Sequence, residues 1–201
     1  MNRKAMKIMK KLITIIMALS LICFGLAGCK NDTSSGIDAT KPQKVLVTME
    51  NGKTFTIKTS PQNAPETSKN FLELVDSGFY NGLTFHRVIP GFMAQGGDPK
   101  GNGTGGAEKT IKGEFSQNGF KDNKLSHTRG IVSMARSQAP DSASSQFFIC
   151  FDDATYLDGA YAAFGEVIDG MDVVDEFAKI PCDNADKPLT PIVIKTMEII
   201  K

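Results

Sequence analysis

The sequence predicts a mainly β protein, a closed barrel with two helices. Its β-favouring runs are short, turn signals rich in glycine separate them, and only two segments place apolar residues at helical spacing. Short strands joined by turns favour an antiparallel sandwich or barrel. With 201 residues, 41% of them hydrophobic and 22% charged, the chain has the size and composition of one globular domain with a short appendage.

The first two strands are predicted as a hairpin over residues 44–59, because apolar and polar residues alternate on both sides of Asn51-Gly52. A helix is predicted next over Pro65 to Ser77, with proline at its start and Gly78 just past its end. The apolar residues that give this segment helical spacing are Phe71, Leu72 and Val75.

Further β-like runs follow, and a second helix precedes the last strand. The second helix is expected over Met171 to Lys179 and the last strand over Pro191 to Ile200. The sequence has no internal repeat, as expected for a single domain. The intervening β-like runs cover residues 84–89, 92–95, 130–135, 145–151 and 162–168.

The N-terminal segment has the organisation of an export signal. A basic segment, Met1 to Lys11, precedes an apolar run over 12–25 that is too short for a membrane span of about 20 residues. The motif LAGC, Leu26 to Cys29, resembles the lipobox of bacterial lipoproteins, whose cysteine is acylated and becomes the first mature residue. The alternatives are an ordinary signal peptide or a membrane helix with a chance cysteine.

The predicted organisation is a signal peptide over 1–28, then a lipid-carrying Cys29 with a flexible tether over 29–42, and a globular domain over 43–201. We therefore expect a lipid-anchored protein at the cell membrane that faces the extracytoplasmic side. Cys150 and Cys182 then remain as the thiols of the mature domain. They could pair, but two separate buried thiols are the expectation.

Composition and motifs argue against several kinds of chemistry. Lys and Arg number 23 against 22 Asp and Glu, so the net charge of +1 does not indicate nucleic-acid binding. His86 and His127 have no metal-ligand spacing, and each is expected to be a hydrogen-bonded structural group. The glycine-rich residues 101–106 lack the ending of a phosphate-binding loop and are expected to form a surface loop. No GxSxG motif indicates nucleophilic hydrolysis, and no metal or cofactor is expected.

Side-chain facing along the predicted strands points to a shallow amphipathic surface. Successive residues of a strand point to opposite faces. If Phe147 and Ile149 fill the barrel, their neighbours point outward. An apolar group with a polar neighbour then recurs on three strands, as expected for a binding surface with an apolar pocket, amide groups and one permanent cation. The pairs placed together are Gln146 with Phe148, Met93 with Gln95, and Phe85 with Arg87.

Five dispersed motifs follow one another along the chain: FHRVIPGFMAQGGDP (85–99), GNGTGG (101–106), SMAR (133–136), SQFFI (145–149) and LDG…FGEV (157–167). Together and in this order they resemble the motifs of the cyclophilins, a family of peptidyl-prolyl cis/trans isomerases. The resemblance covers roughly residues 44–201. It implies an eight-stranded antiparallel β-barrel closed by two helices, in agreement with the pattern of strands.

The resemblance also implies the site residues. Arg87 matches the catalytic arginine of the family. Three positions depart from many eukaryotic members: Tyr156 stands for a tryptophan, Tyr161 for a pocket histidine and Arg136 for an asparagine. The positions expected to bind substrate are Phe92, Met93, Gln95, Ala135, Arg136, Gln146, Phe148, Tyr156, Leu157 and Tyr161.

The function expected from this resemblance is rotation of X–Pro peptide bonds in exported proteins, which assists their folding at the membrane surface. No cofactor is implied, the partners are proline-containing polypeptides, and a monomer is expected. The alternative is a proline-peptide binding or chaperone module with incidental turnover. A surface adhesin or structural lipoprotein has no supporting feature except the predicted anchor.

Overall fold

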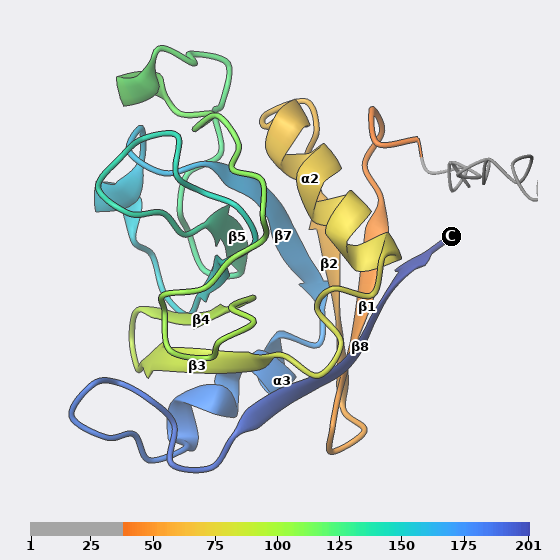
Figure 1. Cartoon of the computed structure of the whole chain (residues 1–201), viewed down its shortest axis with the longest axis vertical. Coiled ribbons are helices and arrows are strands. Elements are labelled where there is room, and N and C mark those ends of the chain that lie inside the picture. Colours follow the sequence, from red (N-terminus) through yellow and green to blue (C-terminus); the bar gives the residue numbers. More distant parts are fainter. Residues whose placement is uncertain (1–37) are drawn as a thin grey trace, which may run out of the picture. The chain divides into compact units, whose positions relative to one another are not determined.

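The computed structural model of the chain describes residues 38–201 (Figure 1). The predicted signal peptide, Cys29 and the first part of the predicted tether lie outside the described residues. The strands are β1 (Lys44–Met49), β2 (Thr54–Thr59), β3 (Thr84–Ile89), β4 (Met93–Gly96), β5 (Ile131–Met134), β6 (Phe147–Cys150), β7 (Ala163–Asp169) and β8 (Ile192–Ile200). The helices are α2 (Pro65–Asp76) and α3 (Met171–Asp175), with short 3₁₀ turns η1 (Ser116–Asn118), η2 (Thr155–Leu157) and η3 (Phe177–Lys179).

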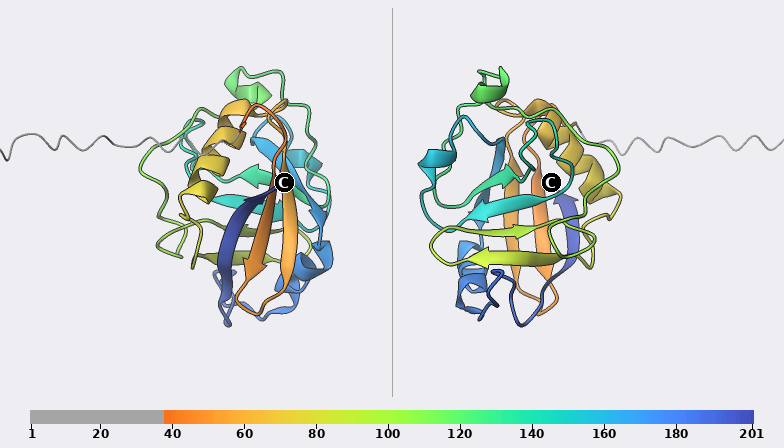
Figure 2. Two further views of the ribbon diagram at one scale, coloured as in Figure 1. Left: turned by 90° about the vertical axis from the view of Figure 1, so that its right-hand side faces the viewer. Right: turned by 60° about the vertical axis from the view of Figure 1, so that its left-hand side comes forward.

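The eight strands close into one barrel in the order β1-β2-β7-β5-β6-β4-β3-β8. Every strand pair is antiparallel, and β1 closes the barrel by pairing with both β2 and β8. The helices α2 and α3 lie toward opposite ends of the barrel (Figure 2). The predicted fold, a closed eight-stranded antiparallel barrel with two helices, is confirmed.

The element boundaries follow the predicted ranges except at the second helix. That helix was expected over 171–179, but α3 ends at Asp175 and the chain continues as the 3₁₀ turn η3. Val174 and Phe177, three residues apart, are both buried. Both side chains thus reach the core, that of Val174 from α3 and that of Phe177 from η3.

Aromatic rings fill the barrel and join it to α2. Phe71 of α2 packs against Tyr80, Phe147 and Phe164, with ring centroids 5.4, 5.7 and 5.0 Å away. All four side chains are fully buried. Tilted and edge-on ring packing at these distances stabilises a core beyond the area that it buries. The many phenylalanines of the sequence therefore build the scaffold of the barrel.

A carboxylate from a distant loop caps α2. The residue before the helix, Ala64, has no side chain able to accept a hydrogen bond from the first turn. Instead, buried Glu114 accepts the backbone N–H of Glu66 at 2.9 Å and that of Thr67 at 2.8 Å. The hydroxyl of Thr67 also donates to it, at 2.6 Å. A carboxylate that accepts these N–H groups, which have no partner within the helix, stabilises the start of α2.

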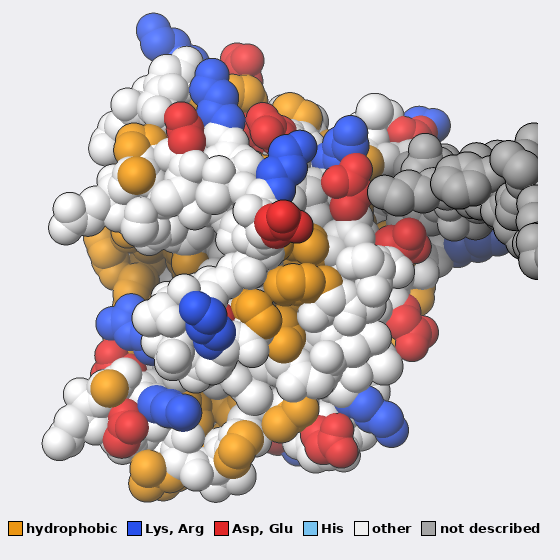
Figure 3. Space-filling model, in the orientation of Figure 1, with side chains coloured by type: hydrophobic (Ala, Val, Ile, Leu, Met, Phe, Trp, Pro, Cys, Tyr) orange, Lys and Arg blue, Asp and Glu red, His pale blue; other side chains and the backbone are white. Residues whose placement is uncertain are grey.

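The last residues assigned to the tether already lie against the barrel. Ala39 packs against the core, and the side chain of Gln43 donates to the backbone carbonyl of Asp38 at 2.9 Å. Among residues 38–201, no helix is both long enough and apolar enough to cross a bilayer. Positive and negative side chains are interspersed over the face drawn in Figure 3.

Candidate active site

An apolar cluster lies on the outer face of β4 and β6. In β6, Phe147 and Ile149 point into the barrel core and Phe148 points outward, as the alternation predicts. The strand register places Met93 of β4 opposite Cys150, so the two side chains share this outer face. The apolar cluster consists of Met93, Phe148, Cys150 and Ala154, with Ile89, Phe92, Ala135, Leu157 and Tyr161 packed around them.

A buried histidine supports Phe148 from behind. The rings of His127 and Phe148 are nearly parallel, 16° apart, with centroids separated by 6.1 Å. The two ring nitrogens of His127 contact Asp158 (Nδ1 to Oδ1, 2.7 Å) and Ser133 (Nε2 to Oγ, 2.9 Å). Burial lowers the pKa of His127 below its usual range, although Asp158 acts in the opposite direction. The imidazole is therefore neutral, with Nδ1–H donating to the carboxylate and Nε2 accepting from the serine.

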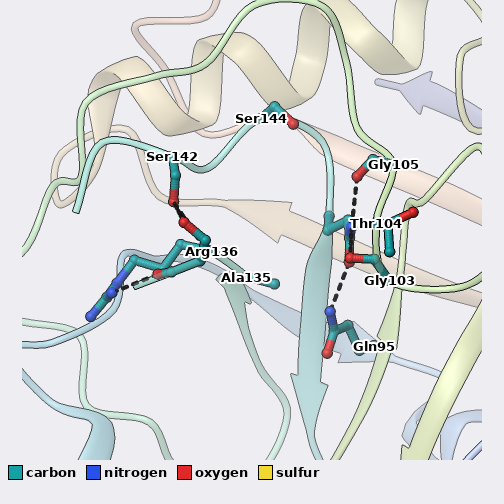
Figure 4. Close-up of a pocket in the computed structure, with 10 residues that line it drawn as sticks. Gln95, Gly103, Thr104, Gly105, Ala135, Arg136, Ser142 and Ser144 are labelled. Atoms are coloured by element: carbon teal, nitrogen blue, oxygen red, sulfur yellow. Dashed lines mark hydrogen bonds between the residues drawn. The ribbon is translucent and has the colours of Figure 1, made fainter. Parts of the chain in front are cut away.

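A polar pocket of about 390 Å³ adjoins the apolar cluster, and Ala135 belongs to both. The amide nitrogen of Gln146 donates to the backbone carbonyls of Gly103 and Gly105, at 3.2 and 2.7 Å. Its oxygen accepts from Nε2 of Gln95 at 2.8 Å. This chain of bonds fixes the orientation of both amides and leaves Oε1 of Gln95 as an acceptor for a bound molecule. Figure 4 shows the pocket residues converging from the glycine loop, β4 and the segments that flank β5 and β6.

The glycine-rich loop contributes to this pocket because its backbone comes close to side chains. Asp98 accepts the backbone N–H groups of Asn102 and Gly103, at 3.0 and 2.6 Å. Gly103 has φ +84°, and a Cβ at Gly105 would overlap the Asp98 carboxylate. The prediction of a loop with left-handed glycines is confirmed at Gly103. Its place in the site was missed, since the sequence gives no sign that its carbonyls would face Gln146.

Arg87 stands on the outer face beside Gln95, but Phe85 does not share that face. In the pairing of β3 with β4, Phe85 lies opposite Gly96 and Arg87 lies opposite Gln95. The chain therefore advances two residues along β3 while it advances one along β4. This β-bulge breaks the alternation. Phe85 is consequently buried in the barrel core while Arg87 is half exposed. The expectation that Phe85 and Arg87 face the same way was wrong.

The guanidinium of Arg136 is engaged by the protein itself. It lies over the rings of Tyr161 and Phe115, 4.6 and 5.1 Å from their centroids. Its Nε and Nη2 donate to the backbone carbonyl of Ala160, at 3.1 and 2.9 Å. Arg136 thereby links the rim of the polar pocket to the wall of the apolar cluster.

The predicted site residues therefore lie together on one face of the barrel, with Tyr156 at its edge. Its side chain is 71% exposed, and its ring contacts that of Phe92 with centroids 5.9 Å apart. Tyr161 packs edge-on against Phe148 at 6.0 Å. Asp186, which forms an ion pair with Arg87, was missed by the sequence analysis, because no local pattern links residues so far apart in the chain.

His86 does not behave as expected. It is buried, but neither of its ring nitrogens has a hydrogen-bond partner among the described residues, so the prediction of a hydrogen-bonded group was wrong for His86 and right for His127. Burial lowers the pKa of His86, so the ring stays neutral. Within residues 38–201, no three His, Cys, Asp or Glu side chains are grouped as a metal site requires.

The two cysteines of the domain are separate thiols, as expected. Cys150 is buried in the apolar cluster, and burial raises the pKa of its thiol to about 12. Cys182 is only half buried, which differs from the expected burial of both. A buried thiol with a raised pKa has little nucleophilic thiolate, so Cys150 serves as a packing residue.

The arrangement combines an apolar cluster, an adjoining polar pocket and two guanidiniums: that of Arg136 is engaged by Tyr161, Phe115 and Ala160, and that of Arg87 stands beside Gln95. The apolar cluster has the character of a site for an apolar ring, and the amides of Gln95 and Gln146 have the donors and acceptors that an extended peptide backbone needs. Nothing in it provides an activated nucleophile. The geometry is that of a peptide-binding surface with the half-exposed guanidinium of Arg87 at its edge.

Comparison with known proteins agrees with this geometry. The family described as "Cyclophilin type peptidyl-prolyl cis-trans isomerase/CLD" matches residues 44–199. The chain is 39% identical to peptidyl-prolyl cis-trans isomerase A of Dickeya dadantii, over 94% of this chain and 97% of that one. It is 42% identical to a probable peptidyl-prolyl cis-trans isomerase of Brucella abortus, over 70% of this chain and 74% of that one.

Solved structures with the same fold include a cyclophilin-type peptidyl-prolyl cis-trans isomerase of Cryptosporidium parvum. It superposes with a TM-score of 0.73 at 34% identity, over 80% of this chain and 99% of that one. The same Cryptosporidium protein in the presence of the dipeptide Ala-Pro gives a TM-score of 0.72 at 35% identity, over 79% of this chain and 99% of that one.

Proposed function

The chain belongs to the cyclophilin-type peptidyl-prolyl cis-trans isomerases, and from this premise we propose that it assists the folding of exported proteins from a lipid anchor at the cell membrane. The reaction breaks no bond. It rotates the amide before a proline, whose barrier of about 18–20 kcal/mol comes from resonance between nitrogen and carbonyl. Without a catalyst the rotation takes tens to hundreds of seconds, which is slow enough to limit folding.

The apolar cluster is the proposed seat of the proline ring. Met93 and Phe148 form its buried floor, and Phe92, Leu157 and Tyr161 form its walls. His127 and its partners hold the ring of Phe148 from behind. A rigid apolar site holds the proline ring while the rest of the peptide turns. The bound peptide then loses less conformational entropy on reaching the transition state.

Arg87 is the proposed catalytic group. When the amide twists, resonance is lost and the lone pair of the prolyl nitrogen becomes available as an acceptor. A guanidinium N–H that donates to this nitrogen binds the twisted state more strongly than the planar one. Such differential binding is what accelerates a step. The observation that carries this role is the bulge in β3, which places Arg87 on the same outer face as Gln95, beside the apolar cluster.

The polar pocket is the proposed site for the peptide that flanks the proline. Oε1 of Gln95 remains an acceptor, and the backbone around Ala135 and Arg136 lines the same pocket. These groups would hold the flanking backbone still, so that rotation occurs about the one amide next to Arg87.

Catalysis and simple peptide binding differ in the amount of isomerase, relative to client protein, that is needed to speed refolding. We expect one molecule of the isomerase to serve about a hundred molecules of a protein whose refolding is limited by proline, because each slow rotation takes tens of seconds without help. The measurement is the rate of the slow refolding phase at increasing isomerase. A rate that rises only when isomerase and client approach equal amounts would favour a binding module.

The proposed anchor is tested with the full chain expressed in a bacterium. The basic start, the short apolar run and the motif ending in Cys29 support it, since two or more acyl chains hold a protein stably on a bilayer. We expect the wild type to incorporate labelled palmitate and to sediment with membranes. The Cys29→Ser variant should do neither. Equal membrane association of both proteins, without label, would contradict a lipoprotein.

A further inference from the structure

An aspartate from a distant loop holds the guanidinium of Arg87. Oδ2 of Asp186 lies 3.2 Å from Nε and 3.2 Å from Nη2 of Arg87. Both side chains are half exposed, at 44% and 42%. Ion pairs at this exposure contribute little to stability, so a need for stability does not account for the contact.

The 182–188 loop is built to present Asp186 at this place. The backbone carbonyl of Asp186 accepts the N–H of Val88, one residue beyond Arg87, at 2.8 Å. Within the loop, the carboxylate of Asp183 accepts the N–H groups of Ala185 and Lys187, at 2.8 and 3.0 Å. The N–H of Asp186 donates to the carbonyl of Asp183 at 3.1 Å. The loop is thus fastened to β3 by its backbone, independently of the ion pair.

The backbone of Asp186 is also strained. Its φ of +62° is in the left-handed region, and among residues 38–201 it is the one residue other than glycine with positive φ. Only glycine adopts this region without cost, while asparagine and aspartate tolerate it better than other residues. Strain of this kind persists where the surrounding structure imposes it, and it concentrates at functional sites.

We infer that Asp186 is a positioning residue, which holds the guanidinium of Arg87 in the orientation that the isomerisation requires. The carboxylate accepts from Nε–H and lies 3.2 Å from Nη2, so both N–H groups of Nη1 and one N–H group of Nη2 are left to donate to a substrate. A half-exposed arginine without such a partner would sample several rotamers. Restricting it to one of them in the transition state would then cost side-chain conformational entropy. This inference rests on the catalytic role proposed above for Arg87.

The test uses two variants that keep the shape of the loop. Asp186→Gly removes the carboxylate and suits a positive φ, and Asp186→Asn keeps an acceptor oxygen but no charge. A matched control is Glu176→Gln, which removes a similarly exposed carboxylate from the ion pair with Lys53. Isomerase kinetics on a proline peptide are measured for each, together with the ¹H–¹⁵N signal of the Arg87 Nε–H group.

For Asp186→Gly we expect kcat to fall about three- to tenfold while KM stays within about twofold, because the contact is used in the twisted state. Asp186→Asn should lie between Asp186→Gly and the wild type, and Glu176→Gln should equal the wild type. The Arg87 signal should shift in both Asp186 variants. In the Arg87→Ala background, Asp186→Gly should have no further effect, since coupled residues are not additive.

The outcomes separate this inference from the proposal on which it rests. If Arg87→Ala is nearly inactive while Asp186→Gly and Asp186→Asn keep the wild-type kcat, the positioning role is wrong and the catalytic role of Arg87 stands. A higher kcat in Asp186→Gly would show that the carboxylate competes with substrate, which also overturns the inference. If Arg87→Ala keeps full activity, both fail.

Discussion

The guanidinium of Arg136 is stacked on the ring of Tyr161, with its central carbon 4.6 Å from the ring centroid. The same guanidinium donates twice to the carbonyl of Ala160, the residue before Tyr161. Tyr161 in turn packs edge-on against Phe148. Arg136, a position expected to bind substrate, therefore uses its guanidinium to hold a wall of the apolar cluster in place.

Removing this brace should weaken substrate binding more than catalysis. We expect Arg136→Ala to raise KM about three- to tenfold with a small change in kcat, because a stacked cation contributes about 0.5–2 kcal/mol. Arg136→Lys should recover part of the loss, since an ammonium keeps the charge but not the planar stack or the paired donors. Steady-state isomerase kinetics measure both. An unchanged KM in Arg136→Ala would contradict the bracing role.

Glu114 should matter for stability rather than for activity. Glu114→Ala removes the acceptor of two backbone N–H groups at the start of α2, and we expect a loss of about 1–3 kcal/mol in the free energy of unfolding. Glu114→Gln should lose less, because one oxygen still accepts. Urea unfolding measures the difference.

The control for this prediction is Glu108→Gln, because Glu108 is exposed. Its unfolding midpoint should match that of the wild type. Equal midpoints for Glu108→Gln and Glu114→Ala would show that the distant cap contributes nothing to the helix.

Stability should fall as the solution is acidified. Burial lowers the pKa of both His86 and His127 from the ordinary 6.5. Between that value and the lower value in the folded state, the unfolded chain takes up protons that the folded chain does not. The contribution of the two neutral histidines to the free energy of unfolding is therefore fully present above about pH 6.5. It is lost as the pH falls from there toward their folded pKa values.

A second decrease is expected in more acidic solution. The pKa values of Asp141, Asp175 and Asp183 lie below the ordinary 3.8 because hydrogen bonds stabilise their charged forms. Their stabilisation is present above that value and is lost as the pH falls through the folded values. Urea titrations from pH 7.5 to 3 follow both stages. A free energy of unfolding that stays constant or rises between pH 7 and 5.5 would contradict the neutral, buried histidines.

Strand facing could be predicted from the sequence because it depends on a local period of two. The alternation in β6 correctly separated Phe148 from Phe147 and Ile149. In β3 the same alternation failed at one position, between Phe85 and Arg87, where a bulge inserts one residue. A bulge is set by the partner strand, so the sequence of β3 alone does not reveal it.

The supporting contacts could not be predicted, for a related reason. Glu114 reaches a helix that begins far back in the chain, and Asp186 reaches Arg87 across 99 residues. Neither pair has a local spacing pattern. The closed barrel brings these partners together, so only the folded arrangement identifies them.

The role of Arg87 as the donor that isomerisation requires is tested most directly by a protease-coupled assay on a proline peptide. We expect Arg87→Ala to lower kcat/KM about a hundredfold or more, as the loss of a transition-state donor does elsewhere. Arg87→Lys should recover little, and Lys53→Ala, which removes the cation of an ion pair at the β1–β2 turn, should match the wild type. Near wild-type activity in a folded Arg87→Ala variant would show that Arg87 is not the catalytic donor.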